Sequence, residues 1–223
     1  MGIPVIVAGR SGTGKSTSMR GFGPQEIGLI NVIGKPLPFR GALKPFETTD
    51  YAVIKEVIAN ATVNAVVIDD AGYLITDMFM TRHASAGAGN GVFALYNDIG
   101  DSFYNLIRFI ASGTRPDMVV YLMMHEDADE MGRAKIKTIG KLLDEKVTIE
   151  GMVSIVLQSE CEDGKYVFRT NGPGICKSPV GMFPTETIPN DLVMVDDTIR
   201  DYWGLGLRGD YALQKERQEG INQ

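Results

Sequence analysis

The sequence predicts an α/β protein with a mostly parallel sheet flanked by helices and an antiparallel hairpin on the C-terminal side. Short apolar runs typical of buried strands alternate with amphipathic helical segments. A glycine-rich loop connects the first run to a helix, and two alternating strands late in the chain are joined through an Asp-Gly turn. At 223 residues we expect one domain over 1–203 and a polar tail over 204–223.

The composition and net charge limit the expected location of the protein and its partners. The chain is 44% hydrophobic and 22% charged, with no apolar run as long as a membrane span and no room for a signal peptide before the first strand. We therefore expect a cytoplasmic protein without a membrane partner. A net charge of -6 argues against non-specific nucleic-acid affinity over the whole surface, although a local basic patch remains compatible with it.

The first strand, 3–8, leads into a loop that matches G-x-x-x-x-G-K-[ST] at every fixed position. Such a loop curls its backbone N–H groups around phosphate, its lysine reaches the β and γ phosphates, and its hydroxyl ligates Mg²⁺. These roles fall to Lys15 and Ser16, and one or two helical turns follow up to Arg20. The predicted nucleotide-binding residues here are Gly9, Arg10, Ser11, Gly12, Thr13, Gly14, Lys15, Ser16 and Thr17.

A second strand is predicted over 28–33, and the prolines and glycines of 34–41 then exclude regular structure. Thr48-Thr49-Asp50 offers N-cap side chains for a helix that ends near Asn60.

The next strand, 65–70, carries two acids at its carboxyl end. In a parallel sheet this end lies at the same edge as the phosphate loop, so Asp69 can approach Ser16 and a metal ion. Asp70 has two interpretations: a base that orients the attacking water, or the N-cap of a helix over 72–80.

The small polar segment 81–91 predicts a mobile loop, followed by a long amphipathic helix through Ile110. Within the loop, Arg82 and His83 are either contacts for DNA or another subunit, or part of a surface linker. A third buried strand over 118–124 ends at His125. That histidine is either a sensor of the γ-phosphate or an ordinary hydrogen-bonded residue at a strand end.

The segment 133–146 holds five Lys or Arg against two acids, a local charge of +3 that either meets phosphates or forms a solvated helix face. Strands over 152–158 and 166–170 form the predicted hairpin. Lys177, in the irregular segment that follows, either faces nucleotide or is a solvated loop lysine. A helix over 191–203 and a polar end over 214–223 complete the chain.

These motifs in this order, together with Gly140-Lys141-Leu142-Leu143-Asp144 and 177–183, resemble one family. The chain is similar to phage-type RecA-core P-loop ATPases, and more narrowly to the Sak-type single-strand annealing and recombination ATPases, also described as phage AAA-domain nucleotide-binding proteins. The resemblance covers nearly the whole chain. It implies a RecA-like core over 1–203 that binds ATP and Mg²⁺.

The resemblance also implies single-stranded DNA binding in phage recombination, replication or repair, hence the host cytoplasm. It implies a homo-oligomer with ATP at subunit interfaces, where Lys177, Arg169 or Lys141 acts on a neighbour's nucleotide. RecA has a catalytic glutamate after its second strand; here the first acid beyond Gly34-Lys35-Pro36 is Glu47. The base is therefore Asp70 or Glu47. The alternative function is a nucleotide-switched loader or assembly factor with negligible turnover.

Overall fold

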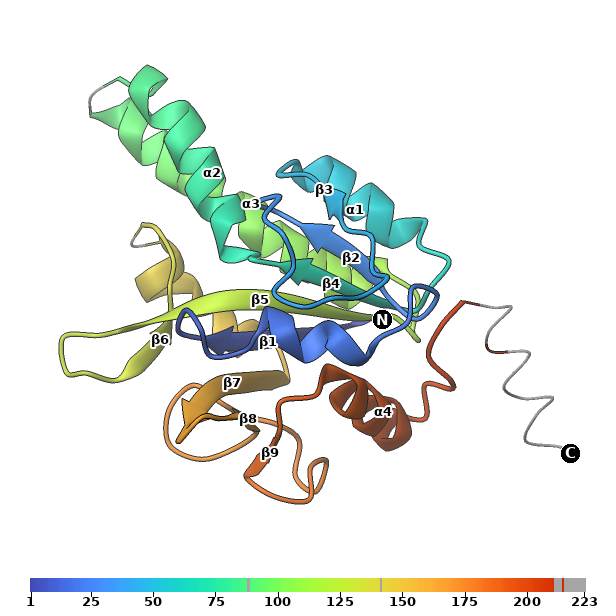
Figure 1. The fold of residues 1–223 in the computed structure, drawn as a ribbon. Helices are drawn as coiled ribbons and strands as arrows, with labels where there is room; N and C mark the ends of the chain where they lie inside the picture. Colours follow the sequence, from blue (N-terminus) through green and yellow to red (C-terminus); the bar gives the residue numbers. More distant parts are fainter. Residues whose placement is uncertain (88, 141, 211–213, 215–223) are drawn as a thin grey trace, which may run out of the picture.

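A computed structural model describes residues 1–87, 89–140, 142–210 and 214 (Figure 1). Within them a nine-stranded sheet follows the order β3-β2-β4-β5-β1-β7-β8-β9, with β6 attached to β5. The strands are β1 (Ile3–Gly9), β2 (Gly28–Asn31), β3 (Phe46–Glu47), β4 (Ala65–Asp69), β5 (Val119–Ala128), β6 (Ala134–Ile136), β7 (Ile155–Glu162), β8 (Lys165–Arg169) and β9 (Thr187–Pro189). The longer helices are α1 (Tyr51–Ala59), α2 (Gly72–Arg82), α3 (Asn90–Gly113) and α4 (Leu192–Trp203).

The predicted α/β class is confirmed: the six strands from β3 to β7 are parallel, and β8 and β9 continue the sheet antiparallel. Alternate residues of β1 enter two different cores, as the period of a strand requires. Ile6 packs with the core beneath α1, α2 and α3. Val5 packs on the other face with residues of α4 and of the 3-10 helix η1 (Ser16–Gly21). Burial on both faces explains why the central strands are continuous apolar runs.

The predicted N-cap of α1 is confirmed, and α4 has a cap of the same kind. The Asp50 side chain accepts hydrogen bonds from the N–H groups of Ala52 and Val53 and caps α1. Asp191 caps α4 in the same way, and Gly204 ends that helix in the left-handed region at φ +63. Among the helices of the described residues, none is both long and apolar enough to span a membrane.

Two local predictions are corrected in the segment from β5 to η3. The strand predicted to stop at Met124 runs on to Ala128, because Ala134–Ile136 pairs antiparallel with its extension. The segment 133–146 is accordingly not one solvated helix: it contains β6 and the start of η3 (Leu142–Val147), a π-helix. Lys141 and the end of the predicted tail, 215–223, lie outside the described residues.

The predicted mobile loop 81–91 is mostly helical where it is described. α2 extends through Arg82, η2 (His83–Ser85) adds a 3-10 turn, and α3 already begins at Asn90. An Arg82–Asp98 ion pair of 2.6 Å ties the two helices together, and the His83 ring stacks on Phe79. The resulting α2–α3 hairpin projects beyond the sheet (Figure 1).

The residues directly after α4 pack against the end of the sheet at which strands β2, β4 and β5 begin. Arg208 is 5% exposed and forms ion pairs with Asp196 and Glu26. Asn64, just before β4, donates to the Leu207 carbonyl and accepts from the Gly209 N–H. The start of the predicted tail therefore belongs to the packed body of the protein.

Candidate functional site: the phosphate-loop cavity

The glycine-rich loop leaves β1 at the carboxyl edge of the sheet, and its glycines are required by its shape. Gly12 and Gly14 lie at φ +83 and +93, where other residues are strained. A Cβ on Gly9 would come within 2.7 Å of the Ser159 carbonyl oxygen, and one on Gly14 within 2.9 Å of the Tyr166 ring. Both the conformation and the close packing of the loop therefore exclude larger residues.

Lys15 folds back over this loop. Its Nζ donates to the carbonyl oxygens of Gly9 at 2.7 Å and Arg10 at 2.8 Å. Burial lowers the pKa of Lys15 to about 8, against partial compensation from nearby Asp70. A buried ammonium held only by carbonyl dipoles is suited to receive an anion, because a phosphate oxygen would supply the negative charge that the loop lacks.

Ser16, which lines the cavity, and Asp69 are in contact, as the sequence predicts. Ser16 Oγ donates to Asp69 Oδ1 at 2.8 Å, and Asp69 Oδ2 is buried with no hydrogen-bond partner among the described residues. Burial raises the pKa of Asp69 and outweighs the opposing hydrogen bond from Ser16. A hydroxyl and an unpartnered carboxylate oxygen fit Mg²⁺, which takes one or two protein oxygens and otherwise water and phosphate.

The described residues contain no cluster of three or more His, Cys, Asp or Glu that could hold a metal by itself. A magnesium ion at Ser16 and Asp69 would therefore depend on the phosphates for its remaining ligands.

Asp70 turns away from the helix that it was considered to cap. It occupies the left-handed region at φ +58, and α2 begins after Ala71 without a side-chain cap. The N-cap interpretation is thus wrong. Asp70 instead forms an ion pair with Lys35 and lies 3.5 Å from His125 Nε2. Burial pushes the pKa of Asp70 upward, but the contacts with His125 and Lys35 outweigh it, so the pKa lies below its usual value.

His125 lies where the strand register predicts, beside the start of the phosphate loop. It pairs in register with Gly9, the last residue of β1, and its ring contacts Tyr73 edge-on at 5.8 Å. The cavity enclosed by these groups has a volume of about 410 Å³. Its lining residues are Ser11, Gly12, Gly14, Lys15, Ser16, Thr17, Lys35, Pro36, Pro38, Asp70, His125 and Tyr166.

Glu47 and Lys177 lie outside this cavity. Glu47 is exposed on the edge strand β3, two strands from Asp69, which corresponds to about 10 Å between backbones. The backbone of Lys177 pairs with Val156 near the start of β7. Among the predicted catalytic groups, the structure thus gathers Lys15, Asp69, Asp70 and His125 and leaves Glu47 apart.

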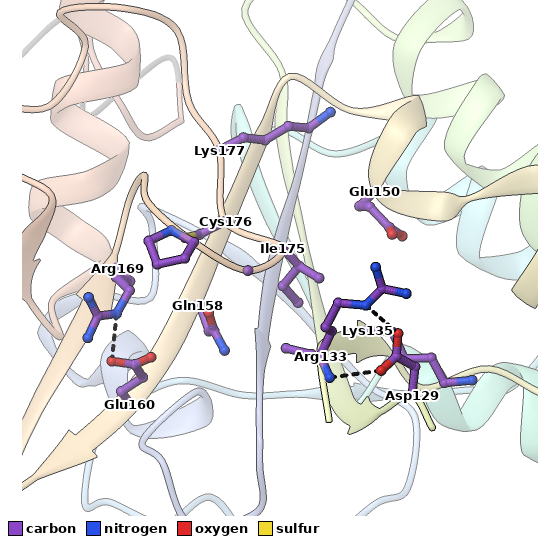
Figure 2. Close-up of a pocket in the computed structure, with 13 residues that line it drawn as sticks. Asp129, Arg133, Lys135, Glu150, Gln158, Glu160, Arg169, Ile175, Cys176 and Lys177 are labelled. Atoms are coloured by element: carbon purple, nitrogen blue, oxygen red, sulfur yellow. Dashed lines mark hydrogen bonds and ion pairs between the residues drawn. The ribbon is translucent and has the colours of Figure 1, made fainter. Parts of the chain in front are cut away.

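Lys177 belongs to a second, larger cavity of about 1190 Å³ between the β5–β6 hairpin, β7, β8 and the segment 173–177 (Figure 2). Within it, Arg169 pairs with Glu160 at 2.9 Å, and Arg133 pairs with Asp129 at 2.7 Å. Its charged lining residues are Asp129, Arg133, Lys135, Glu150, Glu160, Arg169 and Lys177.

A polar connection links the phosphate loop to a residue of the larger cavity. Arg10 of the phosphate loop pairs with Glu126 at 3.4 Å, and Gln158 of the larger cavity donates to the other Glu126 oxygen at 2.9 Å. Sequence reasoning missed Glu126, Gln158 and Lys35. The position of Glu126 directly after His125 was an available signal, whereas no local pattern pointed to Lys35.

A scan against protein-family models and a search of curated proteins found no match to this chain.

Proposed function

We propose that this protein is a P-loop ATPase with a RecA-like core that binds ATP with Mg²⁺ in the phosphate-loop cavity and hydrolyses it. The observation that carries the proposal is the Ser16–Asp69 hydrogen bond, with the second Asp69 oxygen buried and without a hydrogen-bond partner among the described residues. Residues 53 positions apart are brought together in the arrangement that a magnesium-bound triphosphate requires.

Each residue has a distinct part in the proposed reaction. The loop N–H groups and Lys15 bind the phosphates, and Ser16 and Asp69 hold Mg²⁺, which neutralises charge on the β and γ oxygens. Asp70 orients the attacking water, a role better supported than that of Glu47 because Asp70 lines the cavity. His125, between the loop and Asp70, reports the γ-phosphate.

The proposed substrate partner is single-stranded DNA, in phage recombination, replication or repair within the host cytoplasm. This part of the proposal rests on the family resemblance and on the cations of the larger cavity (Figure 2). Arg169 and Lys177 do not line their own phosphate-loop cavity, which is compatible with action on a neighbour's nucleotide in a homo-oligomer.

The test is steady-state ATP hydrolysis with and without single-stranded DNA, at two salt concentrations. Lys15→Ala is the blank, and Lys44→Ala, at an exposed lysine, is the matched control. We expect DNA to stimulate hydrolysis, high salt to reduce the stimulation, and Lys15→Ala to lower turnover by orders of magnitude. Turnover by a folded Lys15→Ala protein at the wild-type rate would contradict the ATPase assignment.

One observation favours a nucleotide-switched loader or assembly factor as the second candidate. Asp70 is held by both Lys35 and His125, so its carboxylate is not free to orient water in this arrangement. Tight ATP binding with no DNA-stimulated turnover would select this alternative.

A further inference from the structure

Lys35 is the one cavity residue whose charge the proposed function does not yet use. It belongs to the irregular segment after β2 and lines the same cavity as Lys15, Ser16 and His125. Its Nζ forms an ion pair with Asp70, while its side chain remains 45% exposed. A half-exposed lysine can change partners at little cost, because its long stem is not locked by packing.

The backbone that carries Lys35 is fixed. Asn31, at the end of β2, is 1% exposed; its side chain donates to the Lys35 carbonyl at 2.7 Å and accepts from the Gly34 N–H at 3.0 Å. Gly34 makes the turn at φ +69. The ammonium group is therefore flexible, but its point of attachment at the cavity mouth is not.

The charges in the cavity favour an exchange of partners. Asp70 is buried, and a polyphosphate entering beside it would bring like charges together in a region of low dielectric. A lysine that moves from the carboxylate to the incoming phosphate supplies positive charge where the phosphate charge accumulates. Lys15 occupies the loop itself, so Lys35 is left for the outer end of the phosphate chain.

We propose that Lys35 is a second phosphate-binding residue supplied by the same chain. When a nucleoside triphosphate binds, the Lys35 ammonium group moves from the Asp70 carboxylate to the terminal phosphate. This inference rests on the proposed function. It adds a sensor that distinguishes triphosphate from diphosphate, and it makes the release of Asp70 a consequence of triphosphate binding. A cation from a neighbouring subunit is then not the only source of positive charge at the terminal phosphate.

The experiment measures the affinity of a non-hydrolysable ATP analogue and of ADP, both with Mg²⁺, by calorimetry at fixed salt. The variants are Lys35→Gln and, as matched control, Lys44→Gln from the same segment, whose side chain is exposed. We expect Lys35→Gln to weaken the triphosphate analogue by about tenfold and ADP by less than about twofold, as for one charged hydrogen bond. Lys44→Gln should change neither affinity.

Asp70→Asn provides a second variant, because asparagine tolerates the left-handed conformation at this position. It frees Lys35 and should tighten the triphosphate analogue, and most of this gain should disappear in the Lys35→Gln, Asp70→Asn double variant. Equal weakening of both nucleotides by Lys35→Gln, or an undiminished gain in the double variant, would overturn the proposal. A wild-type protein that binds neither nucleotide would instead refute the proposed function itself.

Discussion

Replacement of Lys15 by methionine is expected to abolish nucleotide binding without weakening the fold. The ordinary lysine pKa of 10.5 falls to about 8 in the protein, chiefly through burial. The gap of about 2.5 corresponds to about 3 kcal/mol by which the folded state disfavours the charged form at neutral pH. Methionine removes this penalty. It also removes two hydrogen bonds from a charged donor to carbonyl oxygens, worth about 1.5 kcal/mol each or more, so the two effects nearly cancel and the expected net change in stability is within about 1 kcal/mol.

The lowered pKa of Lys15 also sets the direction in which the free energy of unfolding changes with pH. Below pH 8, Lys15 is protonated in both the folded and the unfolded chain, and the burial penalty is fully present. Between about 8 and 10.5 the unfolded chain binds more protons than the folded one, so the free energy of unfolding of the wild type rises with pH relative to that of Lys15→Met. Comparison with the variant cancels the titration of the groups that do not interact with Lys15.

The assay is urea unfolding followed by circular dichroism at pH 7 and pH 10, with Lys44→Met as the control for removal of an exposed lysine. A thermal melt with and without MgATP completes it, because ligand that binds only the folded state raises the melting temperature. We expect this rise in the wild type and not in Lys15→Met. Destabilisation of the variant by more than about 2 kcal/mol at pH 7 would show that Lys15 supports the fold, and the reasoning would be refuted.

Three further outcomes are expected. Ser16→Ala should raise the Mg²⁺ concentration needed for ATP binding by at least about tenfold, and an unchanged requirement would remove Ser16 from the metal site. Gly14→Ala should weaken nucleotide binding and stability more than Gly12→Ala does. Both substitutions strain the backbone by about 1–3 kcal/mol, but only the new methyl group at position 14 meets another side chain. Equal effects of the two substitutions in calorimetry and urea unfolding would contradict this expectation. Asp196→Ala should cost about 3–5 kcal/mol in urea unfolding, because it leaves two buried guanidinium groups without their shared carboxylate. Asp197→Ala, at an exposed carboxylate, should cost at most about 1 kcal/mol, and similar losses in both variants would show that burial is not the cause.

Sequence patterns predicted the elements that depend on neighbouring residues in the chain, such as apolar runs, a helix cap and a turn. The apolar runs of β1, β4 and β5, the Asp50 cap and the Asp-Gly turn of the β7–β8 hairpin all lie where these patterns indicate. The extension of β5 depends on pairing with Ala134–Ile136, and such pairing has no signature within β5 itself. Likewise, the helical content of 81–91 depends on contacts between α2 and α3.

The candidate site likewise contains residues that a sequence motif places and residues that only the tertiary structure brings together. Lys15, Ser16 and Asp69 were predictable because a motif and strand polarity fix their places. Lys35 reaches Asp70 from a segment that composition marks only as irregular, so its role depends on how the chain returns over the cavity. The left-handed backbone of Asp70 is set by tertiary structure and ruled out the local N-cap interpretation.

The packing of Arg208 also constrains how the chain can be made. Its ion pair with Glu26 joins positions 182 residues apart, and the Gly209–Asn64 hydrogen bond spans 145 residues. During synthesis, the start of the sheet therefore leaves the ribosome long before the residues that complete it. Contacts of such sequence separation slow folding, because a long loop must close before they form. Until position 208 has emerged, the contact between Glu26 and Arg208 cannot form, and the packing at this end of the sheet stays incomplete.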